Sequence, residues 1–276
     1  MRIDPDLCVA CGNCLAVCPV GAIRIDPALR RAVIDREQCV ECFTCYRGMS
    51  REHMNPRLVR GIRRGLALLR LRFDPEPDVC PTSAIVPEEL AWPRTLRRAF
   101  SDVQATHAST GILGRGTEEV KTNDVTDRLK EGELGFVVEL GRPSVGVWFR
   151  DIERVTRALA AVGVAFEAEN PITHLMVDRA TGELQPDVMG ERVLSGIVEF
   201  RIPPEKAMDM LALLRRIADD LDTVMSIGLA ARCDGMGANE AEAIMAAAGL
   251  PVLRAKTNLG LGRRDAPGPA VGAEAR

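Results

Sequence analysis

Alternating and helical patterns of apolar residues divide the second half of the chain into six elements. Short apolar runs predict strands at 134–140, 172–177, 193–202 and 223–230. Apolar residues at helical spacing predict helices at 151–162, with Asp151 as the N-terminal cap, and at 204–221, with proline in the first turn. The order β-α-β-β-α-β is the split βαβ arrangement. Because this arrangement serves regulatory, binding and catalytic proteins alike, it leaves the function open.

The same patterns predict an α+β protein in which a small N-terminal unit precedes a β-α-β-β-α-β sandwich domain. We expect the N-terminal unit at 1–86, a linker with a short helix and a Gly-rich polar loop at 87–133, and the sandwich domain at 134–262. A C-terminal helix of that domain is expected to start near Asn239. Residues 263–276 are rich in Ala, Gly and Pro, which predicts a disordered tail.

Composition and charge exclude several classes of protein. Of the 276 residues, 46% are hydrophobic and 27% are charged, which predicts a packed core. The net charge of −3 argues against a nucleic-acid partner bound by bulk charge. No run approaches 18 apolar residues, and the N-terminus lacks the apolar core of a signal peptide, so we expect a cytoplasmic protein without a transmembrane segment.

Eight of the nine cysteines lie in the first 80 residues, in two clusters. They are Cys8, Cys11, Cys14 and Cys18, then Cys39, Cys42, Cys45 and the delayed Cys80. Disulfides would need an oxidising compartment, and zinc sites use two CxxC pairs separated by a longer stretch. The run C-x₂-C-x₂-C-x₃-C-P is the spacing of iron–sulfur ligation, because a tight loop of soft thiolates can wrap three corners of a cubane.

An internal repeat supports the iron–sulfur interpretation. The pattern around residues 4–14 recurs at 35–45, at an offset of 31 residues. The Cys-Pro pattern of Cys18 recurs at Cys80, at an offset of 62. The second copy therefore carries an insert of 31 residues before its last cysteine. Alternating residues at 23–26 and 32–35 predict a hairpin that joins the two copies.

With these motifs, residues 1–86 resemble a bacterial-type dicluster ferredoxin. The resemblance implies two 4Fe–4S clusters as cofactors. It also implies the ligands: Cys8, Cys11, Cys14 and Cys80 for one cluster, and Cys39, Cys42, Cys45 and Cys18 for the other. The insert before Cys80 departs from the family pattern, which leaves the role of Cys80 as a ligand open. The alternative is therefore a three-iron cluster at the site that Cys80 would share.

The insert itself predicts a basic amphipathic helix at 56–73. Leu58, Ile62, Leu66 and Leu69 recur at helical spacing, and arginines line another face. One interpretation is a helix that covers the cluster unit and keeps its arginines in water. The second is a docking surface for an acidic partner or for the rest of an enzyme complex. A membrane-surface helix is disfavoured because the interfacial aromatic residues are missing.

Two further features are candidate sites. Residues 106–124 form a Gly-rich polar stretch whose candidates for contact with a small-molecule ligand are His107, Arg115, Lys121 and Asn123. The alternative is a plain domain connector. The ninth cysteine, Cys233, is expected to be a quiet core thiol, with a nucleophile as the alternative.

A second resemblance covers residues 106–229, which are similar to ferredoxin-fused 6-hydroxynicotinate reductase-like proteins. The stretches 106–111, 121–126 and 139–143 carry it. It implies redox work on a small heteroaromatic or acid substrate, and it assigns no catalytic residue.

Three functions follow. The first is an electron-transfer protein, or the electron-transfer subunit of a larger oxidoreductase, whose partners are a redox protein or other subunits. The second is a reductase whose C-terminal domain binds the substrate. The third is a sensor, although no basic nucleic-acid surface is apparent. We expect the first, and leave a homo-oligomer open.

Overall fold

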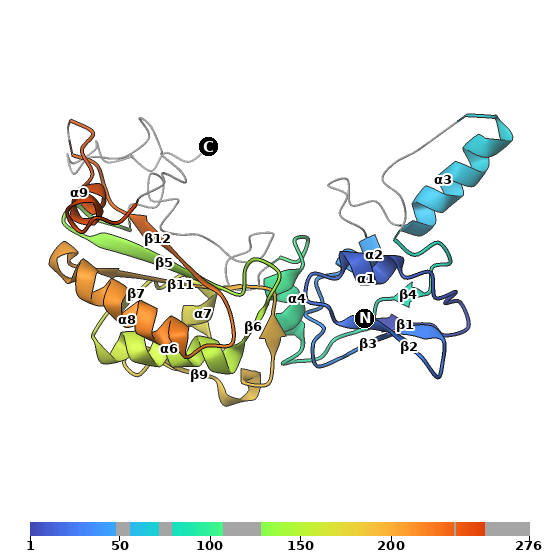
Figure 1. The fold of residues 1–276 in the computed structure, drawn as a ribbon, viewed down its shortest axis with the longest axis horizontal. Coiled ribbons are helices and arrows are strands. Elements are labelled where there is room, and N and C mark those ends of the chain that lie inside the picture. The colour runs from blue at the N-terminus through green and yellow to red at the C-terminus, as the bar shows by residue number, and fades with distance from the viewer. Residues whose placement is uncertain (48–55, 72–78, 107–127, 235, 252–276) are drawn as a thin grey trace, which may run out of the picture.

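The computed structural model describes residues 1–47, 56–71, 79–106, 128–234 and 236–251 (Figure 1). Its buried apolar side chains form separate cores: one in an N-terminal unit that contains the cysteine clusters, and a larger one in a second unit that begins at residue 128. Among these residues, no helix has both the length and the apolar content that a membrane span requires.

The N-terminal unit is built from short elements around its cysteines. Its strands are β1 (Arg2–Ile3), β2 (Ile23–Asp26), β3 (Arg31–Ile34) and β4 (Ile85–Val86), and its short helices are α1 (Asn13–Val17) and α2 (Thr44–Arg47). Strand β1 pairs antiparallel with β4, and β2 pairs antiparallel with β3. The β2–β3 pair is the predicted hairpin, shifted by one residue in its second strand. Three cysteines are buried in this small core, so apolar packing and the thiols share one interior.

Helix α3 (Pro56–Leu68) lies within the insert and ends five residues before the predicted end. The side chains of Leu58 and Leu69 are 56% and 68% exposed. The prediction that this apolar face is buried over the cluster unit is therefore wrong for these two leucines. Periodicity fixes which residues share a helix face, but a face is buried only where another element packs on it.

The second unit is organised by a four-stranded antiparallel sheet. Its strands are β5 (Leu134–Leu140), β7 (Ala165–Phe166), β11 (Gly196–Ile202) and β12 (Met225–Ala230), in the order β12-β5-β11-β7. Strand β5 is central, with Leu134 opposite Ile202 of β11 and Leu140 opposite Met225 of β12. Helix α6 (Phe149–Ala161) lies in the connection between β5 and β7. The connection between β11 and β12 contains η3 (Pro204–Lys206) and α8 (Ala207–Asp219).

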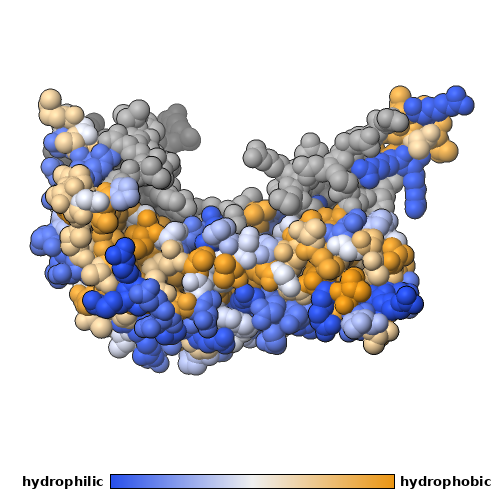
Figure 2. Space-filling view, viewed as in Figure 1, coloured by the Kyte–Doolittle hydropathy of each residue, from blue (hydrophilic) through white to orange (hydrophobic). Residues whose placement is uncertain are grey.

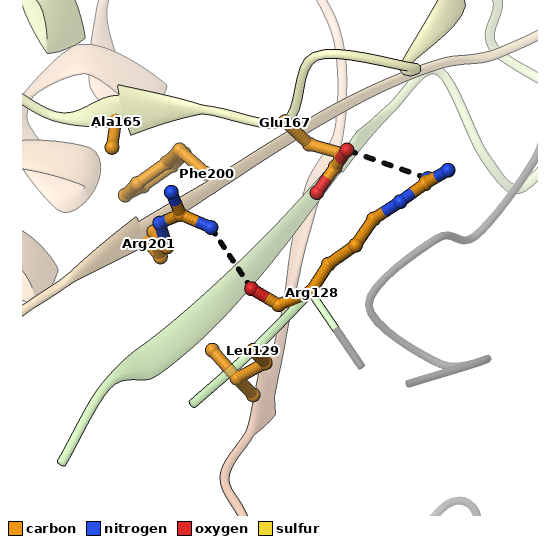
Figure 3. A pocket seen from close by; sticks show the side chains of 6 residues that line it. All are labelled: Arg128, Leu129, Ala165, Glu167, Phe200 and Arg201. Atoms are coloured by element: carbon orange, nitrogen blue, oxygen red, sulfur yellow. Dashed lines mark hydrogen bonds and ion pairs between the residues drawn. The ribbon is translucent and has the colours of Figure 1, made fainter. Parts of the chain in front are cut away.

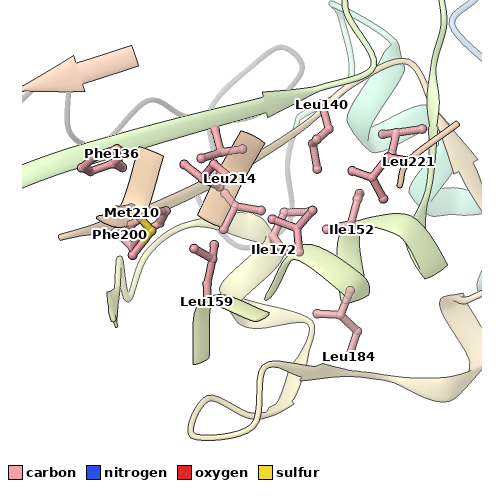
Figure 4. Packing of buried hydrophobic residues seen from close by; sticks show 14 of the residues in the cluster. Phe136, Leu140, Ile152, Leu159, Ile172, Leu184, Phe200, Met210, Leu214 and Leu221 are labelled. Atoms are coloured by element: carbon pink, nitrogen blue, oxygen red, sulfur yellow. The ribbon is translucent and has the colours of Figure 1, made fainter. Parts of the chain in front are cut away.

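The core of the second unit lies between this sheet and helices α6 and α8 (Figure 4). Phe136 of β5 stacks on Phe200 of β11 with ring centroids 5.2 Å apart. Leu159 of α6 and Leu214 of α8 are fully buried in the same cluster. Burial of such side chains contributes about 1.5–3 kcal/mol each, so this layer holds the unit together.

Shorter elements complete the second unit. They are β6 (Val147–Trp148) paired with β10 (Arg192–Val193), β8 (Met176–Asp178) paired with β9 (Glu183–Leu184), α7 (Pro171–His174), η2 (Pro186–Val188) and α9 (Glu240–Ala247). The predicted C-terminal helix is found as α9, capped by the side chain of Asn239.

Three expectations for this unit are wrong. The predicted strand at 193–202 is divided: it begins as β10, which pairs with β6, and only from Gly196 does it continue as β11 of the four-stranded sheet. The predicted strand at 172–177 begins as helix α7, because the side chain of Asn170 accepts a hydrogen bond from the Ile172 amide and Pro171 occupies the first turn. The second sheet strand is β7 instead. Asp151 is not the cap of α6, because the helix begins two residues earlier. It lies in the first turn, where the helix dipole interacts favourably with its carboxylate.

Helix α4 (Thr95–Ser101) lies between the two units (Figure 1). Leu96 and Phe100 belong to the core of the second unit, and Phe100 packs edge-on against Phe149 at 5.5 Å. Arg94, just before α4, and Arg97 within it donate hydrogen bonds to Glu41 and to the Cys39 carbonyl of the N-terminal unit. One short helix therefore fixes how the two units meet.

Candidate functional site

The eight clustered cysteines line two cavities in the N-terminal unit. The outer cavity, of about 320 Å³, is lined by Cys8, Cys11, Cys14 and Cys80, together with apolar side chains and Thr82. The inner cavity, of about 330 Å³, is lined by Cys18, Cys39, Cys42 and Cys45, together with apolar side chains that include Phe43. Each cavity takes three cysteines from one motif and the fourth from the other. The structure thus brings together the two predicted quartets, with Cys80 in the outer one despite the insert.

The two cavities differ in the exposure of one cysteine, since Cys8 and Cys14 of the outer cavity are buried as Cys45 of the inner cavity is. Cys11 at the outer cavity is exposed, and its neighbour Val9 is 60% exposed. Leu7 and Leu29 are also exposed, and hydrophobic residues gather on the face of this unit that Figure 2 shows. At the inner cavity Cys45 is buried, and Val20 faces the second unit, where a methyl group added at Gly146 would lie 3.4 Å from its Cγ1.

Backbone amides point at the cysteine sulfurs. The amides of Ala22 and Ala84 donate to the sulfurs of Cys18 and Cys80, each over 3.2 Å. Cys8 accepts from the amides of Ala10 and Ala32 at 3.4 Å. The two Cys-Pro motifs are therefore alike in geometry as well as in sequence. Such donors stabilise negative charge on sulfur and raise the potential of a bound cluster.

Burial opposes bare thiolates in both cavities. It raises the pKa of Cys14 to about 11 and, helped by the carboxylate of Glu41, that of Cys39 to about 11. The pKa of Cys45 lies well above its ordinary value for the same reason, with neighbouring cysteines adding to the effect. Burial also acts on Cys80, but the Thr82 hydroxyl and backbone amides outweigh it and lower its pKa. Thiols with raised pKa values are protonated when no metal is bound. A cationic metal group favours their deprotonation, because its positive charge stabilises the thiolates that bind it.

Charged residues that sequence reasoning missed surround the inner cavity. Arg97 of α4 is 2% exposed and donates to the carbonyl oxygens of Glu37 and Cys39 at 2.7 and 2.8 Å. Its other nitrogens bind the Gly190 carbonyl and the Glu191 carboxylate of the second unit. Nothing in the sequence marks Arg97, because a charged helix residue is usually solvated and only the meeting of the two units buries it.

Two more arginines lie beside Arg97. Arg192 of β10 donates to the Gln38 side chain and, at 2.5 Å, to the Val145 carbonyl. Its guanidinium and that of Arg97 both lie 5.8 Å from the ring of Trp148. Arg98 lies over the ring of Phe43 at 4.5 Å. Of these three arginines, Arg97 pairs with Glu191 and Arg98 pairs with Asp102, whereas the hydrogen bonds of Arg192 within the described residues go to neutral oxygens.

The other sequence candidates do not join this site. His107, Arg115, Lys121 and Asn123 lie outside the described residues. Cys233 is exposed, so the expectation of a core thiol is wrong. It follows β12, where its backbone bridges to Asn239.

A further cavity of about 280 Å³ lies at the edge of the sheet in the second unit (Figure 3). Its charged residues are Arg128, Glu167 and Arg201. Arg128 pairs with Glu167 at 3.4 Å, and Arg201 donates to the Arg128 carbonyl at 2.9 Å. Two of its lining residues, Arg128 and Leu129, come four and five residues after the end of the Gly-rich stretch 106–124.

Two cysteine quartets with this spacing, in cavities that hold amide donors, define an iron–sulfur protein. Residues 1–48 match the family model of the 4Fe-4S dicluster domain. The N-terminal segment is thus of the dicluster ferredoxin type, and its cofactors are two 4Fe–4S clusters.

Among curated proteins, the segment is 48% identical over 42 residues to Ferredoxin-1 of Rhodobacter capsulatus. The aligned stretch covers 62% of that ferredoxin and 15% of this chain. No solved structure matches the chain significantly.

Proposed function

We propose that this chain is an electron relay, working as the electron-transfer subunit of a larger oxidoreductase. The observation that carries the proposal is the placement of the two cysteine-lined cavities: one opens to solvent at Cys11, and the other abuts the second unit at Val20. The two clusters would accept and release single electrons at these positions. Electrons would enter at one cluster, pass to the other within the chain, and leave from there.

The ligand set of the proposal follows the two cavities. Cys8, Cys11, Cys14 and Cys80 would hold the group in the outer cavity. Cys18, Cys39, Cys42 and Cys45 would hold the group in the inner cavity. The paired amide contacts of Cys18 and Cys80 favour the same role for the last cysteine of each motif.

Docking of a redox partner is proposed at the outer cavity. Leu7, Val9 and Leu29 are exposed apolar residues in the same unit as Cys11, and Val9 lines the outer cavity with it. Apolar contact excludes water and allows close approach, whereas charge mainly steers the encounter. Thiolate-bound clusters also need a compartment that does not form disulfides, which favours the cytoplasm.

The test uses anaerobically purified chain with reduced methyl viologen as donor and cytochrome c as acceptor. We expect two electrons to be taken up per chain and then passed to cytochrome c. Cys11→Ala should take up about half as many, while Cys233→Ser, the matched cysteine outside both cavities, should behave as wild type. A chain that takes up no electrons would overturn the proposal.

A second candidate is a reductase whose second unit has the split βαβ arrangement and binds a small heteroaromatic or acid substrate. The sheet-edge cavity favours it, because Arg128 and Arg201 there could face a carboxylate. The test is turnover of 6-hydroxynicotinate by the reduced chain with no partner added. Activity that Arg201→Ala abolishes, with electron uptake unchanged, would support it; absence of turnover would leave the relay as the function.

A further inference from the structure

We infer that Arg192 raises the reduction potential of the inner site above that of the outer site, so that electrons collect next to the second unit. The inference rests on the proposed function and adds a direction to it. It depends on the distribution of charge around the two cavities, and on residues that lie outside the ferredoxin segment.

The two cavities have different electrostatic surroundings. Neither cavity has an ionised side chain in its immediate lining among the described residues, so the difference lies in the charges behind the lining. Behind the inner cavity, the carboxylate of Glu41 acts on Cys39, but it is bound by the amino group of Met1 and by Arg94. Arg192 lies behind the inner cavity: it donates to Gln38, the residue before Cys39, and a methyl group added at Gly146 would lie 3.4 Å from both its Nε and the Cγ1 of Val20, which lines the cavity. A positive charge stabilises the extra negative charge of a reduced cluster, and the effect is larger where water is excluded.

Arg192 differs from Arg97 because its hydrogen bonds go to neutral oxygens. It donates to both oxygens of Gln38 and to the Val145 carbonyl. Asp35 acts on it through space. By contrast, Arg97 binds the carboxylate of Glu191 directly. The positive charge of Arg192 is therefore not neutralised by a hydrogen-bonded carboxylate, and it can act on the inner cavity.

The contacts of Arg192 also hold it in place. Its strand β10 pairs with β6, which sets Arg192 opposite Trp148. Arg97 fixes the neighbouring loop by binding the carbonyls of Glu37 and Cys39. The charge consequently sits at a defined position at the boundary between the inner cavity and the second unit.

The resulting step is a one-electron exchange within the chain. An external one-electron donor reduces the outer site; the outer site then loses one electron and the inner site gains one, with no bond made or broken. If the inner site has the higher potential, the electron rests beside Trp148 and the second unit. The exposed site is then returned to its oxidised form and can accept again.

The test is an anaerobic potentiometric titration followed by electron paramagnetic resonance. Cys11→Ala assigns the potentials, because the cluster that remains in it is the inner one. We expect that cluster to titrate at the higher of the two wild-type potentials. Arg192→Met should make its reduction at least tenfold less favourable, which for one electron is about 59 mV.

Two variants separate charge from structure. Gln38→Glu keeps Arg192 but gives it a carboxylate partner, so it should lower the same potential as Arg192→Met does. Arg192→Lys keeps the charge and should leave the potential close to wild type. The control is Arg24→Met, which removes an arginine that is 65% exposed and should shift neither potential.

The inference would be overturned if the cluster in Cys11→Ala titrated at the lower potential. It would also be overturned if Arg192→Met and Gln38→Glu left the inner potential unchanged. In both cases the wild-type chain would still take up two electrons, so the proposed relay would stand. A wild-type chain that took up none would contradict the relay itself.

Discussion

Asp102 is the residue whose charge should matter most for the junction of the two units. It ends helix α4 and is fully buried. Its carboxylate accepts two hydrogen bonds from Arg47 of α2, at 2.6 and 2.5 Å, one from Arg98 at 3.1 Å and one from the Gln104 amide at 2.9 Å. Asp102→Asn preserves the size of the side chain but removes the charge that both arginines face.

The loss of stability expected for Asp102→Asn depends on how deeply the charges are buried. Removing one partner of a buried ion pair costs about 3–5 kcal/mol, because the other charge is left uncompensated. The side chain of Arg47 is 12% exposed, and that of Arg98 is 46% exposed, so water recovers part of this loss. We therefore expect about 3 kcal/mol, the lower end, which is more than a hundredfold in the unfolding equilibrium.

The assay is anaerobic urea unfolding followed by tryptophan fluorescence, because Trp92 and Trp148 both lie near the junction. The control Asp219→Asn alters an exposed carboxylate at the end of α8 and should change stability by less than about 0.5 kcal/mol. If Asp102→Asn were as stable as Asp219→Asn, the reasoning would be refuted.

The pH dependence gives a second check on Asp102. Burial raises its pKa, but the hydrogen bonds from Arg47 and Gln104 outweigh burial and hold the pKa below its ordinary value of 3.8. A carboxylate with a depressed pKa in the folded state stabilises it above the unfolded pKa and loses that effect as the pH falls through the folded value. The difference between wild type and Asp102→Asn should therefore stay constant from about pH 8 to about pH 5. A difference that shrinks within this range would mean that the pKa is raised.

Two other predictions test the fold and the insert. Gly182 and Gly163 both have φ near +70°, but a methyl group at Gly182 would clash with the carbonyl oxygen of Thr156, whereas at Gly163 it meets nothing within 4 Å. Gly163→Ala should cost about 1 kcal/mol of strain and Gly182→Ala about 1–3 kcal/mol more, by thermal unfolding; equal losses would contradict the packing. Deleting residues 48–78 gives Cys80 the C-x₃-C-P spacing of the first motif, so iron content should not fall; a loss of half would show that the insert holds a cluster.

Long, strongly patterned elements could be predicted from the sequence. The strand at 134–140 has the predicted bounds, because its apolar run is buried on both faces. The helix at 204–221 is found as η3 and α8. The iron–sulfur interpretation could be predicted from the spacing of the cysteines, whereas their division into two quartets was implied by the resemblance to dicluster ferredoxins.

The elements that were missed depend on contacts that periodicity does not encode. Strand β7 has two residues, too few for any period, and is defined by pairing with β11. Helix α7 depends on a single side-chain cap from Asn170. The buried roles of Arg97 and Asp102 arise where two units meet, and a pattern along one helix gives the identity of such residues but not what they face.

Iron and acid-labile sulfide analysis of anaerobically purified protein tests the central claim most directly. Two 4Fe–4S clusters require eight iron and eight sulfide per chain. We expect these values in wild type and in Cys233→Ser, and about half of each in Cys11→Ala. A colourless chain that carries zinc, or a Cys11→Ala variant with unchanged iron, would contradict the assignment of the two cavities.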